Sequence, residues 1–347
     1  MIREIRPLDE AAMRMAQKRW DGIAKPLNGL GLLEQMVVRI AGMQQSCDVS
    51  IDRRCVLVLC ADNGVVCEGV SQVGREVSAL VAENIARGAA SVNAMARAAR
   101  ADVVAVDSGL ATDVDCPALL RRKLAYGTGN IAAGPAMTRG EAQAMIEIGI
   151  ELAETCADQG YQLLLTGEMG IGNTTTSGAV AAALLGLSPE AVTGRGAGLS
   201  DAGLMRKRSA IERAIALNRP DPGDPIDVLS KLGGFDLAAM AGVFLGGARR
   251  GLPVVIDGLI SGVAALIAAR LLPAARDYML TSHLSRELAG QCVLEALGLP
   301  PPVLHAQMAL GEGTGAVALL PLIDMALNVY RQNSTFDEIH LPAYTPQ

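Results

Sequence analysis

Residues 161–185 read YQLLLTGEMGIGNTTTSGAVAAALL, and this stretch decides the fold class. Its first part, residues 161–166, has a continuously apolar centre, which is typical of a strand buried on both faces of a parallel sheet. A glycine-rich turn follows at residues 167–176, and an alanine-rich helix is expected over residues 177–185. A strand, a tight turn and a helix in this order predict one unit of an α/β fold.

The same alternation recurs along the chain. Four further apolar runs predict strands at residues 55–60, 102–107, 253–257 and 277–281. The longer segments between them predict helices at residues 78–100, 139–159, 205–218 and 237–249. Alternating strands and helices form right-handed βαβ units, so we expect a doubly wound parallel sheet flanked by helices. Ligands in such sheets bind beyond the carboxyl ends of the strands, which places the expected site before any motif is considered.

The two ends of the chain differ from its middle. Residues 1–45 and 313–332 are mostly helical in pattern and contain no convincing strand. We therefore expect residues 1–45 and 313–347 to pack together as a small helical domain. Residues 46–312 should form a large α/β domain that carries the active site.

Composition and charge exclude several classes of protein. The net charge is −6, so no basic stripe is available to neutralise nucleic-acid phosphates. The most hydrophobic span, residues 252–272, contains Pro253, Asp257 and Arg270, which argue against a membrane helix. The seven cysteines lack a CxxC pair and the N-terminus lacks the apolar region of a signal peptide, so we expect a cytoplasmic protein with reduced thiols. The three histidines lack the spacing of a zinc site, and we expect no metal.

The turn at residues 167–176 predicts an anion site. It joins three glycines to an Asn and three hydroxyl residues at a helix N-terminus, where backbone N–H groups and the helix dipole favour negative charge. Gly170, Asn173 and Thr174 belong to this turn. The alternative is an ordinary capped turn. Glu168 favours a ligand instead, because a carboxylate inside an anion cradle is useful when it holds a ribose hydroxyl.

Glu312 lies between two glycines in LGEGTGA (310–316), directly before an apolar helix. One interpretation is a general base whose access is kept open by its glycine neighbours. The other is a carboxylate that satisfies the dipole of the helix it precedes. This pattern alone leaves both interpretations open.

A nicotinamide-dependent dehydrogenase would share the doubly wound sheet. It should carry GxGxxG after the first strand, with an acidic residue about 20 positions later. The first predicted strand leads instead into ADNGVVCEG (61–69), which does not fit that pattern.

Five segments together resemble one known family. In chain order they are GTGNIAAGPAMTR (127–139), GEMGIGNTT (167–175), KLGGFDLAAMAG (231–242), VVIDGLISGVAAL (254–266) and LGEGTGA (310–316). They resemble the nicotinate-nucleotide:dimethylbenzimidazole phosphoribosyltransferases, which activate the lower-ligand base in cobamide synthesis. The resemblance extends from KPLNGLGLLE (25–34) to the final helix, and it implies a Rossmann-like sheet and a homodimer with shared sites.

The resemblance also implies roles for single residues. Glu312 matches the proposed catalytic glutamate of the family, and Glu168 matches a second glutamate of the site. Lys207, in GLMRKRSAIERA (203–214), matches a lysine that contacts the donor phosphate. Gly170 and Ser285 fall where the family supplies further phosphate contacts. The remaining expected phosphate or ribose contacts are Asn173, Thr174 and Asp257, and the expected base contacts are Val73, Leu80, Met169 and Leu310.

The implied reaction moves ribose 5-phosphate from nicotinate mononucleotide to 5,6-dimethylbenzimidazole or a related base, without a cofactor. The alternative is a partner-dependent or non-catalytic homologue that only binds bases. The chain also departs from the family, because Asn63 stands where relatives often have a histidine. A histidine at this position therefore cannot be required for the chemistry here.

Overall fold

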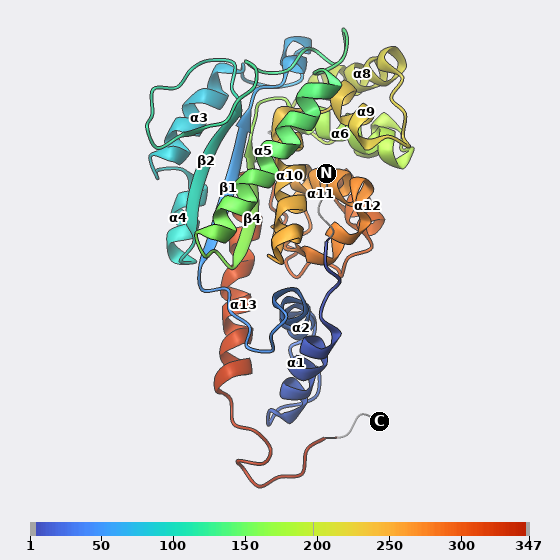
Figure 1. Cartoon of the computed structure of the whole chain (residues 1–347). Helices are drawn as coiled ribbons and strands as arrows, with labels where there is room; N and C mark the ends of the chain where they lie inside the picture. Colours follow the sequence, from blue (N-terminus) through green and yellow to red (C-terminus); the bar gives the residue numbers. More distant parts are fainter. Residues whose placement is uncertain (1–4, 197, 345–347) are drawn as a thin grey trace.

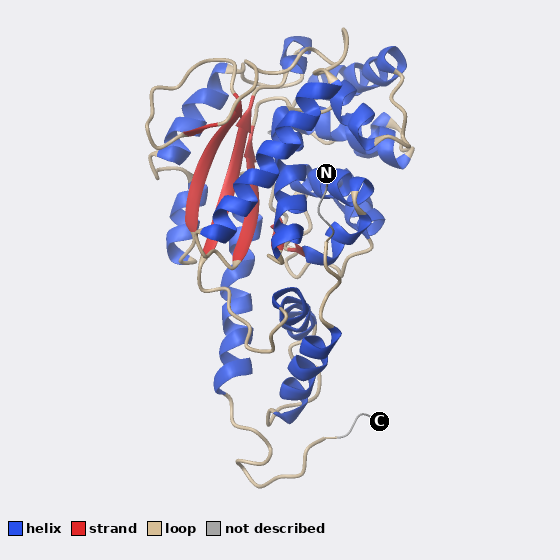
Figure 2. Cartoon of the chain, viewed as in Figure 1, coloured by secondary structure: helices blue, strands red, loops and turns tan. Residues whose placement is uncertain are grey.

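The computed structural model describes residues 5–196 and 198–344. Its centre is a six-stranded sheet in the order β3-β2-β1-β4-β5-β6, in which all neighbouring strands are parallel. Figure 2 shows this sheet with helices on both sides. The strands are β1 (Arg54–Ala61), β2 (Asp102–Gly109), β3 (Leu120–Arg121), β4 (Leu163–Met169), β5 (Val254–Ile256) and β6 (Met279–Thr281). The doubly wound α/β fold expected from the sequence is confirmed.

The two central strands carry the fold because they are buried on both faces. All eight residues of β1 are buried, and in β4 only the last residue, Met169, is partly exposed. From β1 the chain moves outward to β2 and β3, and then returns to the other side of β1 to form β4. The carboxyl ends of β1 and β4 therefore flank the topological switch point, where open α/β sheets bind their ligands.

Each face of the sheet is covered by three helices (Figure 1). One face carries α3 (Glu76–Ala86), α4 (Ser91–Ala98) and the first part of α13 (Thr314–Gln332). The other carries α5 (Arg139–Asp158), α10 (Phe235–Arg250) and α11 (Leu259–Leu271). Residues 235–248 of α10 are all buried, because this helix lies between the sheet and α5.

The other helices gather on the side of α10 and α11. They are the α-helices α6 (Asn173–Leu185), α7 (Pro189–Val192), α8 (Asp201–Asn218), α9 (Pro225–Leu232) and α12 (Ala289–Leu297), with the short 3₁₀ helices η1 (Gly64–Glu68) and η2 (Pro273–Tyr278). Among the described helices, none is long and apolar enough to cross a membrane.

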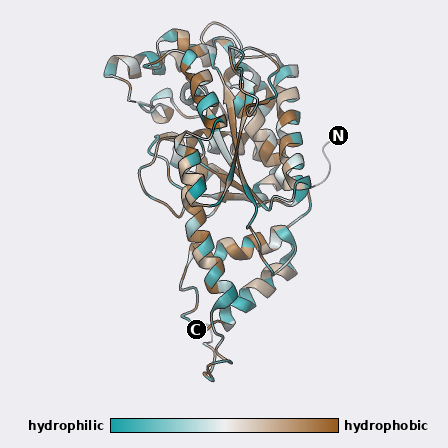
Figure 3. Cartoon of the chain, turned by 90° about the vertical axis from the view of Figure 1, so that its left-hand side faces the viewer, coloured by the Kyte–Doolittle hydropathy of each residue, from teal (hydrophilic) through white to brown (hydrophobic). Residues whose placement is uncertain are grey.

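The chain ends meet in a narrow extension below the sheet (Figure 1). Here α1 (Glu10–Gly22) and α2 (Leu32–Gln44) pack together beside α13. The rings of Trp20 and Tyr330 lie 5.0 Å apart, and Ile23 pairs with Thr335. Figure 3 shows hydrophobic ribbon concentrated in the sheet region, with hydrophilic turns along this extension. Because α13 contacts both β4 and α2, the division into two domains stays a prediction.

Local details differ from the sequence-based expectation. The single helix expected at residues 78–100 was wrong, because the chain turns at Gly88 (φ +80°) and separates α3 from α4. The two-residue strand β3 was missed, since so short an edge strand has no periodicity of its own. Helix α6 begins at Asn173 and not at residue 177, directly after Gly172 in the left-handed conformation.

We expect Gly242→Ala to destabilise the fold, because α5 and α10 are in backbone contact at this position. A Cβ at residue 242 would overlap the carbonyl oxygen of Ile146 in α5. Overpacking of this kind costs about 1–3 kcal/mol. Gly22→Ala is the control, since a Cβ there has no atom within 4 Å. Urea denaturation should show a lower unfolding free energy for the first variant alone; equal stability of the two variants would contradict this packing.

Candidate active site

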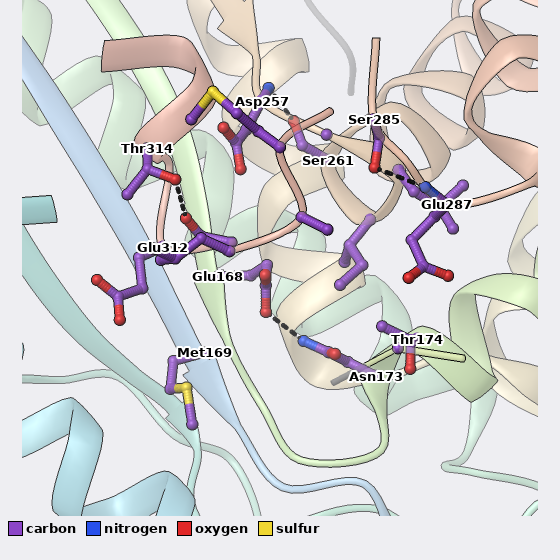
Figure 4. Close-up of a pocket in the computed structure, with 18 of the residues that line it drawn as sticks. Glu168, Met169, Asn173, Thr174, Asp257, Ser261, Ser285, Glu287, Glu312 and Thr314 are labelled. Carbon is purple, nitrogen blue, oxygen red and sulfur yellow. Dashed lines mark hydrogen bonds between the residues drawn. The ribbon is translucent and has the colours of Figure 1, made fainter. Parts of the chain in front are cut away.

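A cavity of about 250 Å³ opens at the carboxyl ends of β4, β5 and β6 (Figure 4). It lies where the sheet topology predicts a ligand site. Nine of the residues proposed from the sequence line it: Glu168, Met169, Gly170, Asn173, Thr174, Asp257, Ser285, Leu310 and Glu312.

The loop before α13 brings Glu312 to this cavity through an uncommon backbone conformation. Gly311, Glu312 and Gly313 all have positive φ values, of 85°, 61° and 89°. Only glycine adopts such values without cost, so Glu312 is held in a strained conformation by its surroundings. The loop also packs directly on β4, where a Cβ at Gly167 would overlap the Glu312 carbonyl oxygen. The glycines of LGEGTGA are therefore explained by positive φ values and by close packing.

Glu312 and Glu168 are joined through the backbone, but their side chains diverge. The Glu312 amide donates to the Glu168 carbonyl oxygen at 3.3 Å. Figure 4 shows the two carboxyl groups pointing in different directions from this contact. One Glu312 oxygen, Oε2, accepts the Val92 amide at the start of α4 at 3.0 Å, while Oε1 accepts no hydrogen bond from the described residues. The second oxygen is therefore available to a ligand.

Glu168 is the acid whose environment differs most from water. Burial raises its pKa to about 8, although the hydrogen bond that the Asn173 amide donates to Oε2 opposes this shift. The negative charges of Asp236, Asp257 and Glu312 raise it further. Strongly shifted carboxyl groups in a cavity mark functional sites more often than structural ones.

Asp257 occupies the far wall and joins the cavity to α13. Its Oδ1 accepts the Ala316 amide at 2.9 Å, and burial raises the pKa of this carboxyl. His283 Nε2 lies 3.8 Å from the same oxygen. Sequence reasoning did not single out His283, although polar residues after a strand end were noted as a signal. It also missed Glu287, whose Oε2 is buried without a hydrogen bond in the described residues.

Lys207 lies behind the cavity wall and not on it. Its Nζ donates to Thr174 Oγ1 at 2.9 Å and to the Gly194 carbonyl oxygen at 3.3 Å. The side chain is 1% exposed, and burial lowers its pKa to about 8. Within the described chain, no carboxylate forms an ion pair with Lys207. An anion beside Thr174, at the N-terminus of α6, would supply the missing negative charge.

Two residues expected at the base do not line this cavity. Val73 is 45% exposed and Leu80 is 64% exposed. The apolar wall of the cavity consists instead of Met169, Leu310 and their neighbours. Over residues 5–196 and 198–344, no group of His, Cys, Asp and Glu side chains is arranged to hold a metal ion.

The cavity thus has two chemically different ends joined by acids. The N-terminus of α6 and Lys207 favour an anion, whereas Met169 and Leu310 offer apolar surface to a flat ring. Glu168 and Glu312 lie between these ends and can accept or donate protons. The arrangement suits a substrate that carries an anionic group, together with a second, mostly apolar molecule.

The chain is similar to known proteins over its whole length. Residues 5–340 match the sequence model of a family described as phosphoribosyltransferase. The nicotinate-nucleotide–dimethylbenzimidazole phosphoribosyltransferase of Acetivibrio thermocellus is 46% identical over 346 residues, covering 100% of this chain and 98% of that relative. The protein of the same name from Chloroflexus aggregans is 47% identical over 338 residues, covering 97% and 96%.

Two crystal structures from Thermus thermophilus are also similar. One is described as the nicotinate-nucleotide–dimethylbenzimidazole phosphoribosyltransferase, with a TM-score of 0.90 and 42% identity over 96% of this chain and 99% of that chain. The other is described as CobT, with a TM-score of 0.91 and 43% identity over 96% of this chain and 100% of that chain. The matched regions include every described residue that lines the cavity up to Thr314.

We expect Glu168→Gln to stabilise the protein at alkaline pH. The folded state raises the pKa of Glu168 from 4.5 to about 8, so the unfolded chain ionises this group first. The resulting penalty for wild type is absent below pH 4.5, grows as pH rises to about 8 and is then constant. At pH 9 the variant should be more stable by about 3 kcal/mol or more, since one pKa unit corresponds to about 1.4 kcal/mol.

Chemical denaturation at pH 5, 7 and 9 measures this difference. The control is Glu147→Gln on the exposed side of α5. A Glu168→Gln protein whose advantage does not grow with pH would show that Glu168 is ionised in the native state at neutral pH.

Proposed function

The chain belongs to the nicotinate-nucleotide–dimethylbenzimidazole phosphoribosyltransferase family, and we propose that it transfers ribose 5-phosphate from nicotinate mononucleotide to 5,6-dimethylbenzimidazole or a related lower-ligand base. One observation carries the proposal. The family segments at residues 167–175 and 310–316, far apart in the sequence, contribute facing walls of one cavity. This pentosyl transfer belongs to the assembly of the cobamide nucleotide loop.

The donor phosphate is proposed to bind at the N-terminus of α6. Gly170 and Thr174 lie there on the cavity wall, and Ser285 faces them from the loop after β6. Lys207 would act through its contact with Thr174 or directly on a phosphate oxygen. Asn173 and Asp257 are the proposed contacts for the ribose hydroxyls, which need acceptors that carboxylates and amides supply.

The base is proposed to bind between Met169 and Leu310, beside Glu312. A benzimidazole is flat and mostly apolar, and it presents one ring N–H and one unprotonated ring nitrogen. The free Oε1 of Glu312 can accept the N–H, while apolar side chains cover the ring. Val73 and Leu80 remain proposed contacts at the mouth of the site.

The reaction exchanges one C–N bond for another at C1′ of the ribose. The pyridine nitrogen of nicotinate mononucleotide is quaternary and positively charged, so nicotinate leaves with the bond electrons and needs no proton. The unprotonated nitrogen of the base attacks C1′ from the opposite face, which gives the α-riboside 5′-phosphate. As this nitrogen becomes cationic, the other ring N–H grows acidic and passes its proton to Glu312, for a benefit of about 10²–10⁴-fold. Holding base and sugar in line supplies the remaining acceleration.

Glu168 supports the cationic donor in this scheme. Nicotinate mononucleotide combines a positive ring nitrogen with a negative phosphate, and carboxylates near C1′ stabilise positive charge as the glycosidic bond breaks. The donor carries one phosphate and no pyrophosphate, so the mechanism has no step that needs a metal ion or a cofactor.

Three further statements belong to the same proposal. The protein is proposed to be a cytoplasmic homodimer, as the family resemblance and the unpaired cysteine pattern suggest. A partner-dependent, non-catalytic homologue would bind bases without releasing nicotinate. A dehydrogenase would require a dinucleotide fingerprint after β1, and ADNGVVCEG stands there instead.

Incubation of the purified chain with nicotinate mononucleotide and a panel of benzimidazole and purine bases tests the function. Mass spectrometry should detect nicotinate and one riboside phosphate, both dependent on the base. Release of nicotinate without any new riboside would indicate a hydrolase, and absence of both products would indicate the non-catalytic homologue.

We expect Glu312→Gln to lower kcat by about 10²-fold or more while the KM for the base stays nearly unchanged. The glutamine keeps the size of the side chain and can still accept the Val92 amide, but it cannot take up a proton. Steady-state kinetics and thermal melting on the same preparation measure both properties. If Glu312 only satisfies a helix dipole, the variant would instead be fully active and less stable by about 0.3–1 kcal/mol.

Lys207→Met should raise the KM for the donor by about tenfold or more, because a charge-assisted hydrogen bond contributes about 1.5–3 kcal/mol. Since the pKa of Lys207 is about 8, the wild-type donor KM should also rise above pH 8, as the ammonium group loses its proton. The variant should lack this rise. Lys18→Met, on the exposed side of α1, is the control. A change confined to the KM of the base would refute the phosphate assignment.

A further inference from the structure

A second buried carboxyl group, Asp236, lies behind the cavity at the start of α10. Its side chain is fully buried, and Oδ1 accepts the Leu237 amide at 2.9 Å. No Lys or Arg in the described chain forms an ion pair with it. Burial raises its pKa to about 6. A carboxylate this close to ionisation, without a cation, depends on neutral donors and on the helix dipole for its charge.

Two amide side chains and two glycines surround this carboxyl group. The Asn63 and Asn173 amides face Asp236 closely enough to oppose the rise in its pKa. A Cβ at Gly170 would lie 3.1 Å from Asp236 Oδ2 and 3.2 Å from Asn63 Nδ2. A Cβ at Gly234 would overlap Asp236 Oδ1. The backbone therefore packs directly on these polar groups, and a larger residue at either glycine would displace them.

This buried group reaches the cavity through a single residue. Asn173 faces Asp236 on one side, and on the other its Nδ2 donates to Glu168 Oε2 (Figure 4). An amide has only one NH₂ group and one oxygen, so its orientation decides whether Glu168 receives a donor. Asn63 Oδ1 also accepts the Thr176 hydroxyl at 3.2 Å, which ties the same cluster to the first turn of α6.

We propose that Asp236 is a positioning residue for the transfer reaction: it orients the Asn173 amide toward Glu168, and its charge controls how readily Glu168 releases a proton. The proposal rests on the proposed function, because Glu168 acts on the donor there. A negative Asp236 attracts the NH₂ side of Asn173 and also repels the ionised form of Glu168. The orientation and the proton affinity of Glu168 are thus set by one residue that does not touch the substrate.

Other groups face Glu168 as well and belong in the comparison. They are Asp257 after β5, Glu312 before α13 and the Cys60 thiol of β1, and the two carboxylates also raise the pKa of Glu168. Only Asp236 couples to Glu168 through an intervening amide as well as by charge. Replacing it therefore has two separable effects.

Carbon-13 NMR of glutamate carboxyl groups tests the charge effect on the full chain without substrates. The Glu168 signal is assigned by its loss in Glu168→Gln, and its midpoint should fall by about one pH unit in Asp236→Asn, because a neighbouring negative charge is removed. The control, Asp48→Asn, alters a carboxylate that is 91% exposed and should leave the midpoint unchanged. An unchanged midpoint in Asp236→Asn would overturn the proposal.

A double-mutant cycle tests the positioning effect. We expect Asp236→Ala and Asn173→Ala each to lower kcat/KM by about tenfold, and the double variant to be no worse than Asn173→Ala alone. In Asp236→Asn the basic limb of the kcat/KM profile should move to lower pH along with the Glu168 midpoint. Independent, multiplicative losses would show that Asp236 does not act through Asn173.

The two proposals can fail separately. If Asp236→Ala does not fold, as judged by thermal melting, Asp236→Asn carries the decision through its NMR midpoint and its pH profile. A wild-type chain that releases no nicotinate would refute the proposed function, whereas a normal transferase with an unshifted Glu168 midpoint would refute only the role of Asp236.

Discussion

The packing of residues 311–313 against the end of β4 is the constraint on which the rest of the site depends. Three successive residues with positive φ are unfavourable unless glycines occupy two of the positions and the neighbouring structure fixes the third. Here the neighbouring structure is Gly167, which lets the loop touch the central strand. This contact joins the end of the chain to its middle. It also places Glu312 and Glu168 back to back, so that one cavity receives two acids directed toward different reactants.

The charges of the site make physical sense only with a substrate present. Glu168, Asp236 and Asp257 are buried together without an ion-paired Lys or Arg in the described chain, and Lys207 is buried without an ion-paired carboxylate. Burying unpaired charges costs several kcal/mol, and a stable protein keeps them when they serve a ligand. A donor with a cationic ring nitrogen and an anionic phosphate supplies the complementary charges at the two ends. The raised pKa of Glu168 and the lowered pKa of Lys207 are therefore two signs of the same preparation for binding.

The sequence predicted the sheet and most of the cavity because both leave local signals. Apolar runs such as residues 55–60 and the glycine-flanked Glu312 are visible in the chain itself, and parallel strands bring their carboxyl ends to one edge. What could not be predicted depends on tertiary contacts. The break at Gly88 is one glycine in an otherwise helical pattern, and the position of Lys207 behind Thr174 follows from how α8 packs on α6. Asp236 looked like one polar residue of a glycine-rich loop; its burial beside Asn173 emerges only when α10 is placed against the sheet.

A crystal structure of the chain with nicotinate mononucleotide and 5,6-dimethylbenzimidazole bound to the Glu312→Gln variant tests the central claim most directly. The account predicts the phosphate at the N-terminus of α6 near Lys207, the base between Met169 and Leu310, and a ring nitrogen of the base within hydrogen-bond distance of residue 312. The ribose C1′ should lie between base and nicotinate, with Glu168 on the donor side. A base bound away from residue 312, or a phosphate at the opposite end of the cavity, would contradict the division of labour between the two glutamates.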